Sequence, residues 1–69
     1  MLFYIVDDDE AVRSMLDHII EDEDLGRLAG EANDGSKIDG QVLNAKNVNI
    51  LIIDLLMPDQ DGIQTIRKI

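Results

Sequence analysis

The chain has 69 residues, with 15 aspartates and glutamates against 6 lysines and arginines, which gives a formal net charge of −9 at pH 7. Such a surface repels phosphate backbones, so direct nucleic-acid binding by this piece is not expected. The sequence has no cysteine, which excludes disulfides and thiolate zinc sites and suits a reducing cytoplasm. The hydrophobic fraction of 45% is too high for a disordered acidic tail, and the length fits one small domain or part of one.

The first segment, residues 2–6, is apolar and rich in β-branched and aromatic residues, and it stops at the acidic run 7–10. This pattern predicts a strand that is buried on both faces. The run is too short for a membrane span and has the wrong flanks for a signal peptide, so we expect a cytoplasmic protein. Asp9 is expected to cap a helix whose apolar residues recur every three or four positions, namely Val12, Met15, Leu16, Ile19 and Ile20.

The middle of the chain carries weaker signals. Residues 25–32 alternate weakly between apolar and polar and precede the turn sequence Asn-Asp-Gly at 33–35, which indicates an edge strand. Ser36 is predicted to cap a second helix that runs to Ala45. Gly40 inside that helix would cost about 1 kcal/mol relative to alanine, which makes this helix the weakest element.

The last third of the chain begins with the sequence Asn-Ile-Leu-Ile-Ile at 49–53, which ends at Asp54. A run of this kind predicts the central strand of a parallel sheet, covered on both faces. Residues 55–62 predict a loop, after which a helix begins at Ile63. The alternation of strands and helices favours an α/β fold with right-handed crossovers and helices on both faces of the sheet.

Carboxylates follow two of the predicted strands. Asp7 and Asp8 come after the first strand and Asp54 closes the third, and in such sheets ligands bind outside the carboxyl ends of the strands. Three carboxylates in one crevice repel one another, and a bound hard cation is the simplest way to keep them ionised. Mg²⁺ is the natural candidate because it keeps water ligands and leaves positions for phosphate oxygens. The alternative is that all three are ordinary strand-end residues that face solvent.

Three stretches together resemble the receiver domains of two-component response regulators: residues 4–13 (Tyr-Ile-Val-Asp-Asp-Asp-Glu-Ala-Val-Arg), 33–35 (Asn-Asp-Gly) and 50–62 (Ile-Leu-Ile-Ile-Asp-Leu-Leu-Met-Pro-Asp-Gln-Asp-Gly). Their order and spacing are similar to the family's over the entire chain. The resemblance implies a flavodoxin-like parallel sheet, truncated here to strand, helix, strand, helix, strand and helix. Residues 1–69 would then be the N-terminal portion of one receiver domain.

The same resemblance implies roles for particular residues. Asp54 would be the phosphoacceptor for a sensor histidine kinase. Mg²⁺ would be bound by Asp54, by Asp8 directly, by Asp7 through water and by the backbone carbonyl of Leu56. The parent protein would be a transcriptional regulator, and the domain would be no enzyme beyond assisting its own phosphotransfer.

A complete receiver has two further strands, which carry a hydroxyl residue and a lysine that contact the phosphate. Neither strand is expected here, and no serine, threonine or lysine of this chain is assigned to those roles. The strand at 50–53 would then have an unpaired apolar edge, which favours self-association. Two other hypotheses stay open: a self-associating structural unit with a vestigial site, and a small acidic binder of divalent metals that never accepts phosphate.

Overall fold

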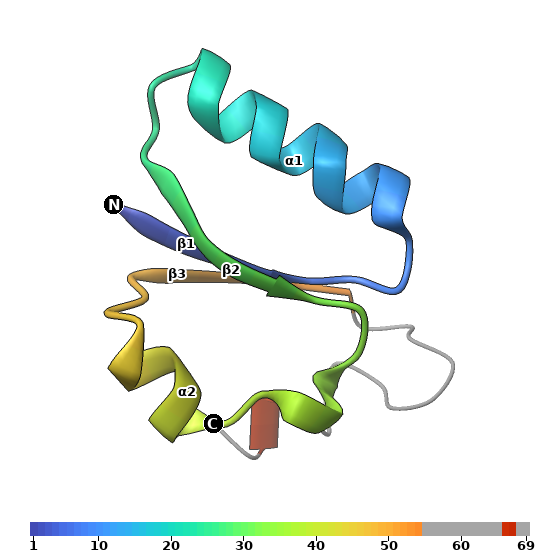
Figure 1. Cartoon of the computed structure of the whole chain (residues 1–69), viewed down its shortest axis with the longest axis vertical. Helices are drawn as coiled ribbons and strands as arrows, with labels where there is room; N and C mark the ends of the chain where they lie inside the picture. Colours follow the sequence, from blue (N-terminus) through green and yellow to red (C-terminus); the bar gives the residue numbers. More distant parts are fainter. Residues whose placement is uncertain (55–65, 68–69) are drawn as a thin grey trace.

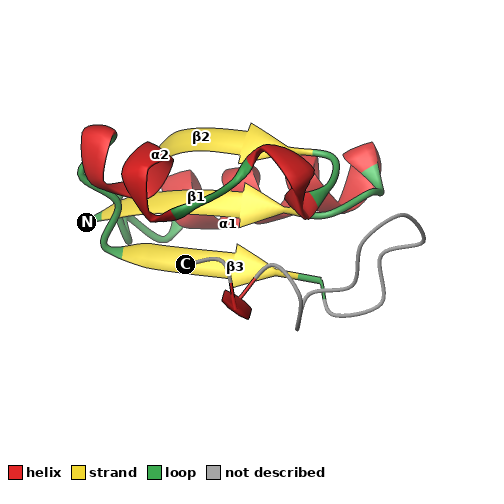
Figure 2. Cartoon of the chain, turned by 90° about the horizontal axis from the view of Figure 1, so that it is seen from below, coloured by secondary structure: helices red, strands yellow, loops and turns green. Residues whose placement is uncertain are grey.

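The computed structural model describes residues 1–54 and 66–67. Three strands form one parallel sheet in the order β2-β1-β3 (Figure 2). One face of the sheet is covered by a long helix and the other by a short helix and a single 3₁₀ turn (Figure 1). The elements in chain order are β1 (Leu2–Val6), α1 (Glu10–Asp22), β2 (Arg27–Ala32), the 3₁₀ turn (Gly35–Lys37), α2 (Gly40–Ala45) and β3 (Ile50–Ile53). This arrangement confirms the predicted α/β class and agrees with a truncated flavodoxin-like sheet.

Strand β1 supplies the centre of the hydrophobic core on both faces of the sheet. Its side chains alternate, so Phe3 and Ile5 pack with Ile20 beneath α1, while Tyr4 and Val6 pack on the α2 side. Ile5 and Val6 are completely buried. The prediction of a first strand buried on both faces is therefore confirmed.

The apolar pattern predicted a central third strand, which is wrong for the described sheet; β3 lies at an edge of that sheet, as the resemblance to a truncated receiver implied. β1 lies in the middle and pairs with β2 on one side and β3 on the other. All four residues of β3 are half-buried, and within residues 1–54 and 66–67 no strand pairs with the outer edge of β3. Its uniformly apolar sequence reflects burial of both faces of the strand, and it does not require a hydrogen-bonded strand along each edge. β2 lies at the opposite edge, as predicted.

The predicted cap of the second helix is also wrong, because two aspartates displace Ser36. The Asp34 carboxylate accepts hydrogen bonds from the backbone N–H and the hydroxyl of Ser36, which closes the 3₁₀ turn. Ile38 is extended, and Asp39 then caps α2 by accepting from the Val42 N–H at 2.9 Å. Gly40 is consequently the first residue of α2 and does not interrupt it.

The first helix follows the prediction more closely, since the Asp9 carboxylate caps α1. The predicted loop at 55–62 lies outside the described residues, as does most of the last predicted helix; Ile66 and Arg67 are helical. Among the helices in the described part of the chain, none has the length and apolar character needed to cross a membrane.

Gly26 lies where the chain passes from α1 into β2, and its conformation gives a test of this connection. Its φ is 158°, and a Cβ there would lie 2.0 Å from the Met1 carbonyl oxygen, which accepts the Arg27 N–H. A Gly26→Ala substitution is therefore expected to lower the free energy of unfolding by about 1–3 kcal/mol. Urea denaturation followed by circular dichroism measures this change.

Gly40→Ala is the matched control for that substitution. Gly40 begins α2 with a helical backbone, so alanine there should leave stability unchanged or raise it by up to about 1 kcal/mol. A Gly26→Ala protein as stable as the wild type would contradict the close approach of the two segments.

Candidate metal centre

Two neighbouring strands bring three aspartates to one edge of the sheet. β1 and β3 run parallel with Val6 opposite Ile53, so the residues that follow them emerge side by side. The register continues one residue further, because the Asp54 N–H donates to the Val6 carbonyl at 2.9 Å. Asp7 and Asp8 therefore leave β1 beside Asp54, as the sequence pattern predicted.

The carboxylates of Asp7, Asp8 and Asp54 converge closely. One oxygen from each lies within 4.8 Å of the others. Asp7 and Asp54 are half-buried and Asp8 is exposed. Carboxylate oxygens are the ligands that hard divalent cations prefer, and three of them on a partly open edge leave room for water and for further oxygens. The donor set therefore fits Mg²⁺, and it also places three like charges together when no cation is bound.

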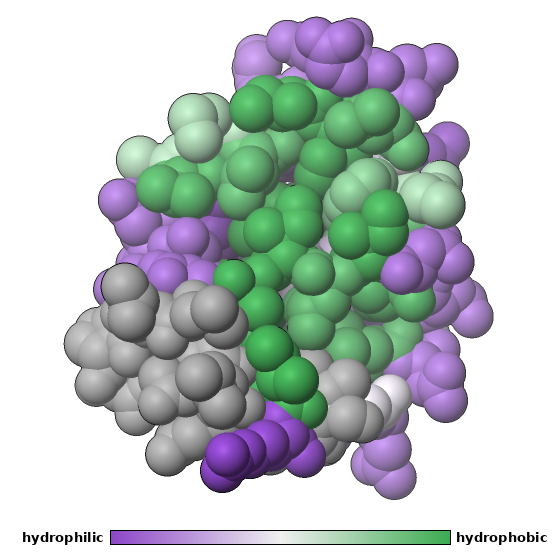
Figure 3. Space-filling view, turned by 180° about the vertical axis from the view of Figure 1, so that it is seen from behind, coloured by the Kyte–Doolittle hydropathy of each residue, from purple (hydrophilic) through white to green (hydrophobic). Residues whose placement is uncertain are grey.

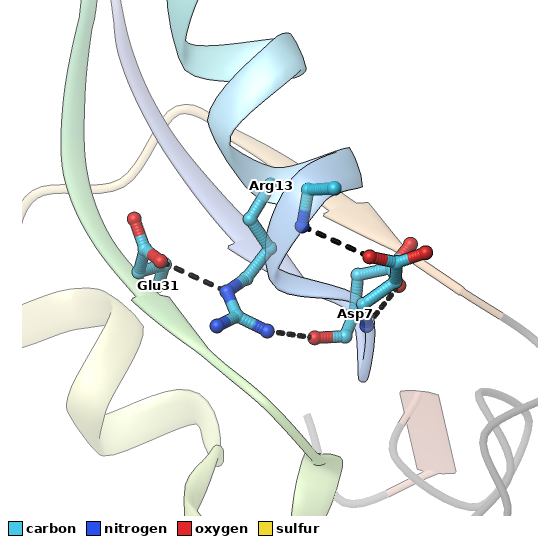
Figure 4. A network of polar contacts seen from close by, with 5 residues as sticks. Asp7, Arg13 and Glu31 are labelled. Carbon is cyan, nitrogen blue, oxygen red and sulfur yellow. Dashed lines mark hydrogen bonds and ion pairs between the residues drawn. The ribbon is translucent and has the colours of Figure 1, made fainter.

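Hydrogen bonds hold the turn that carries Asp7 and Asp8. One oxygen of the Asp7 carboxylate accepts from the Asp9 N–H at 2.8 Å, and the Asp9 carboxylate accepts from the Ala11 N–H at 2.9 Å (Figure 4). Asp9 thus connects the two features, because its N–H donates to the Asp7 carboxylate and its own carboxylate caps α1. Asp9 acts as the helix cap that was predicted for it and is not a member of the carboxylate cluster.

Arg13, a basic residue for which the sequence predicts no role, lies next to this turn. The Arg13 guanidinium donates through Nε to Glu31 on β2 at 2.8 Å and through Nη1 to the carbonyl oxygen of Asp7 (Figure 4). The sequence gives little indication of the contact between Arg13 and Glu31, because Arg13 is a polar residue of an amphipathic helix and Glu31 lies 18 positions away. Only the packing of α1 against the sheet brings them together.

Arg13 and Glu31 also line an open cavity of about 300 Å³ together with Tyr4, Ala32 and Asn33. Burial raises the pKa of the Tyr4 hydroxyl, and the negative charge of Glu31 raises that pKa further. The lining residues come from β1, α1 and the end of β2, and none of the three clustered aspartates is among them.

One further predicted ligand cannot be placed beside the three aspartates. Leu56, whose carbonyl was predicted as a metal ligand, lies outside the described residues, and so does the rest of the 55–62 loop.

Comparison with known proteins decides the family of the chain. The model of the response regulator receiver domain matches residues 3–69. The chain belongs to the response regulator receiver family. The predicted resemblance is thereby confirmed.

Relatives of this receiver chain include proteins with different outputs. It is 64% identical to the transcriptional regulatory protein GlnL of Bacillus subtilis over 69 residues, which is 100% of this chain and 22% of that protein. It is 36% identical to the DNA-binding transcriptional regulator NtrC of Proteus hauseri, over 96% of this chain and 13% of that protein. It is 34% identical to the protein-glutamate methylesterase/protein-glutamine glutaminase 3 of Hahella chejuensis, over 94% of this chain and 18% of that protein.

The receiver chain thus spans less than a quarter of the length of each of these three relatives. No solved structure gives a significant match.

Proposed function

We propose that the chain is a phosphoacceptor module that receives a phosphoryl group on Asp54 from a sensor histidine kinase, with Mg²⁺ bound at the carboxylate cluster. The observation that carries this proposal is the convergence of Asp7, Asp8 and Asp54 within 4.8 Å in a chain of the receiver family. Asp8 would bind the cation directly, Asp7 through water, and Asp54 and the Leu56 carbonyl would complete the protein ligands. Residues 1–69 would form the N-terminal portion of one receiver domain.

The chemistry at Asp54 is a nucleophilic displacement at phosphorus. A carboxylate oxygen of Asp54 forms a P–O bond, the P–N bond of the phosphohistidine breaks, and the departing imidazole nitrogen keeps the electron pair and takes up a proton. When bound, Mg²⁺ neutralises the charge on the transferred oxygens. Asp54 is suited to this role because it is half-buried and its backbone is held by the hydrogen bond to Val6. The product is an acyl phosphate, so the chain acts as an acceptor and not as an enzyme with turnover.

The parent protein is proposed to be a cytoplasmic transcriptional regulator. The 64% identity to the transcriptional regulatory protein GlnL supports this output over that of the methylesterase relative. With a net charge of −9, the present chain would leave DNA contact to another part of the parent protein. The hydroxyl residue and the lysine that contact phosphate in receivers would also come from other parts of that protein.

Titration of the protein with Mg²⁺, followed by amide NMR spectra, tests the site itself. The proposal expects shifts centred on Asp7, Asp8 and Asp54, with the far end of α1 unaffected. An unchanged spectrum in millimolar Mg²⁺ would leave only the structural alternative for this chain.

Self-association is the second candidate function, and the outer edge of β3 favours it. Strand β3 has no charged side chain at Ile50–Ile53. Charged side chains are one means by which edge strands prevent pairing with another strand, and β3 lacks it. Figure 3 shows a broad apolar surface on the side of the molecule where β3 lies. We propose a second copy of the chain as the occupant, since two β3 edges related by a two-fold axis present the same apolar sequence to each other.

Light scattering during size-exclusion chromatography tests this assembly. The expected mass is twice that of the 7.7 kDa chain, falling towards the monomer on dilution. Ile50→Lys places a charge on the edge strand and should shift the equilibrium to the monomer, whereas Asn44→Lys on the exposed face of α2 should not. Because Ile50 also packs against Phe3, Ile5 and Ile20, circular dichroism must show that the variant is folded. A wild-type protein that stays monomeric at every concentration with native circular dichroism would refute self-association.

A further inference from the structure

Arg13 connects three separate segments at the edge of the candidate metal centre. It belongs to α1, it donates to Glu31 on β2, and it donates to the carbonyl oxygen of Asp7 at the end of β1 (Figure 4). Its side chain is only 13% exposed, whereas that of Glu31 is 43% exposed. The guanidinium is therefore fixed by packing and by two partners, and it points at the turn that precedes α1.

We infer that Arg13 is a positioning residue for the metal centre, so that cation binding depends on it although it contacts no cation. This inference rests on the proposed function. The carbonyl that Arg13 holds belongs to the peptide plane between Asp7 and Asp8, and the orientation of that plane sets the directions in which both carboxylates leave the turn. The preceding peptide is held as well, because the Asp7 N–H donates to the Ala32 carbonyl at 3.1 Å.

The two hydrogen bonds therefore fix Asp7 from opposite sides, one through the sheet and one through α1. The Asp7 carboxylate is additionally tied to the Asp9 N–H. A guanidinium suits this position because its planar fork donates from Nε and Nη1 at once, and charge-assisted bonds of this kind are stronger than neutral ones. A lysine ammonium carries its three donors on one nitrogen, so it does not present two separated donors in a plane as Nε and Nη1 do.

Charge and position predict opposite effects of removing Arg13, which makes the inference testable. A positive charge close to the cluster repels a cation, so its removal alone would strengthen Mg²⁺ binding. Loss of the bond to the Asp7 carbonyl would instead free the peptide plane between Asp7 and Asp8 and weaken binding. Residues that orient metal ligands are typically worth about 10–100-fold in affinity.

The test is Mg²⁺ affinity of the full chain, measured by NMR titration for the wild type, Arg13→Met, Arg13→Lys and Arg27→Met. Arg27 is exposed at the opposite end of β2 from the centre, so Arg27→Met controls for the loss of one positive charge. We expect Arg13→Met and Arg13→Lys each to bind Mg²⁺ roughly tenfold more weakly than the wild type. Arg27→Met should bind as tightly as the wild type or slightly more tightly.

Unchanged affinity in Arg13→Lys, or tighter binding in Arg13→Met, would overturn the inference. If Arg13→Met fails to fold, Arg13→Lys decides it, because lysine keeps the charge and the stem. A wild type that binds no Mg²⁺ would defeat the proposed function instead.

Amide hydrogen exchange tests the inference in the absence of metal. Amide exchange at Asp9 should be faster in both Arg13 variants than in the wild type, while exchange at Asp54 stays unchanged. Equal exchange rates at Asp9 in the wild type and in Arg13→Lys would contradict the positioning role.

Discussion

Replacing Asp8 by asparagine is expected to weaken Mg²⁺ binding by roughly 100-fold or more, because even residues that only orient metal ligands are worth about 10–100-fold. Asp8 is the exposed member of the three clustered carboxylates and the one proposed to contact the cation directly. Isothermal titration calorimetry measures the change. Asp22→Asn at the far end of α1 removes one negative charge away from the centre and should leave the affinity close to that of the wild type.

Asp8→Asn is also expected to stabilise the protein when no metal is present. It removes repulsion between carboxylates whose oxygens lie within 4.8 Å, and the gain in the free energy of unfolding should be on the order of 1 kcal/mol at low ionic strength. The gain should shrink in high salt, because the charge is exposed and screened. An Asp8→Asn protein with wild-type Mg²⁺ affinity would mean that the cluster is not the cation site.

Sequence patterns predicted those features that depend on neighbouring residues in the chain. The apolar run from Leu2 to Val6 required burial on both faces, and the structure provides it. The cap at Asp9 and the placement of carboxylates after β1 and β3 followed from local chemistry and from the parallel arrangement alone. These features bring Asp7, Asp8 and Asp54 together at the candidate metal centre, and the sequence alone predicts their convergence.

Features that depend on competition or on tertiary packing could not be predicted in this way. Ser36 is a good capping residue, but Asp34 and Asp39 flank it and accept the backbone hydrogen bonds instead. The contact of Arg13 with Glu31 depends on how α1 lies across the sheet. A periodic pattern locates the buried face of a helix, but it does not say which residue on its border reaches a neighbouring strand.

The position of β3 illustrates a further limit. Its apolar sequence predicts a central strand, although β1 occupies the centre of the described sheet; only the resemblance to a truncated receiver implies the observed edge position. A strand that is covered on both faces and a strand that is paired along both edges can have the same uniformly apolar sequence. The sequence pattern alone therefore does not distinguish them. The pairing partners of each strand become known only from the fold.

The central claim is that Asp54 accepts a phosphoryl group and that the Asp7 and Asp8 carboxylates help to bind the Mg²⁺ ion needed for this step. Intact-mass spectrometry after incubation with Mg²⁺ and a small acyl-phosphate donor tests it most directly, with Asp54→Asn as the variant that keeps the shape and removes the nucleophile. The prediction is one added phosphoryl group on the wild type, dependent on Mg²⁺ and absent from Asp54→Asn. An equal adduct on both proteins would contradict the assignment of Asp54. No adduct on either protein would favour the alternative of a structural unit with a vestigial site.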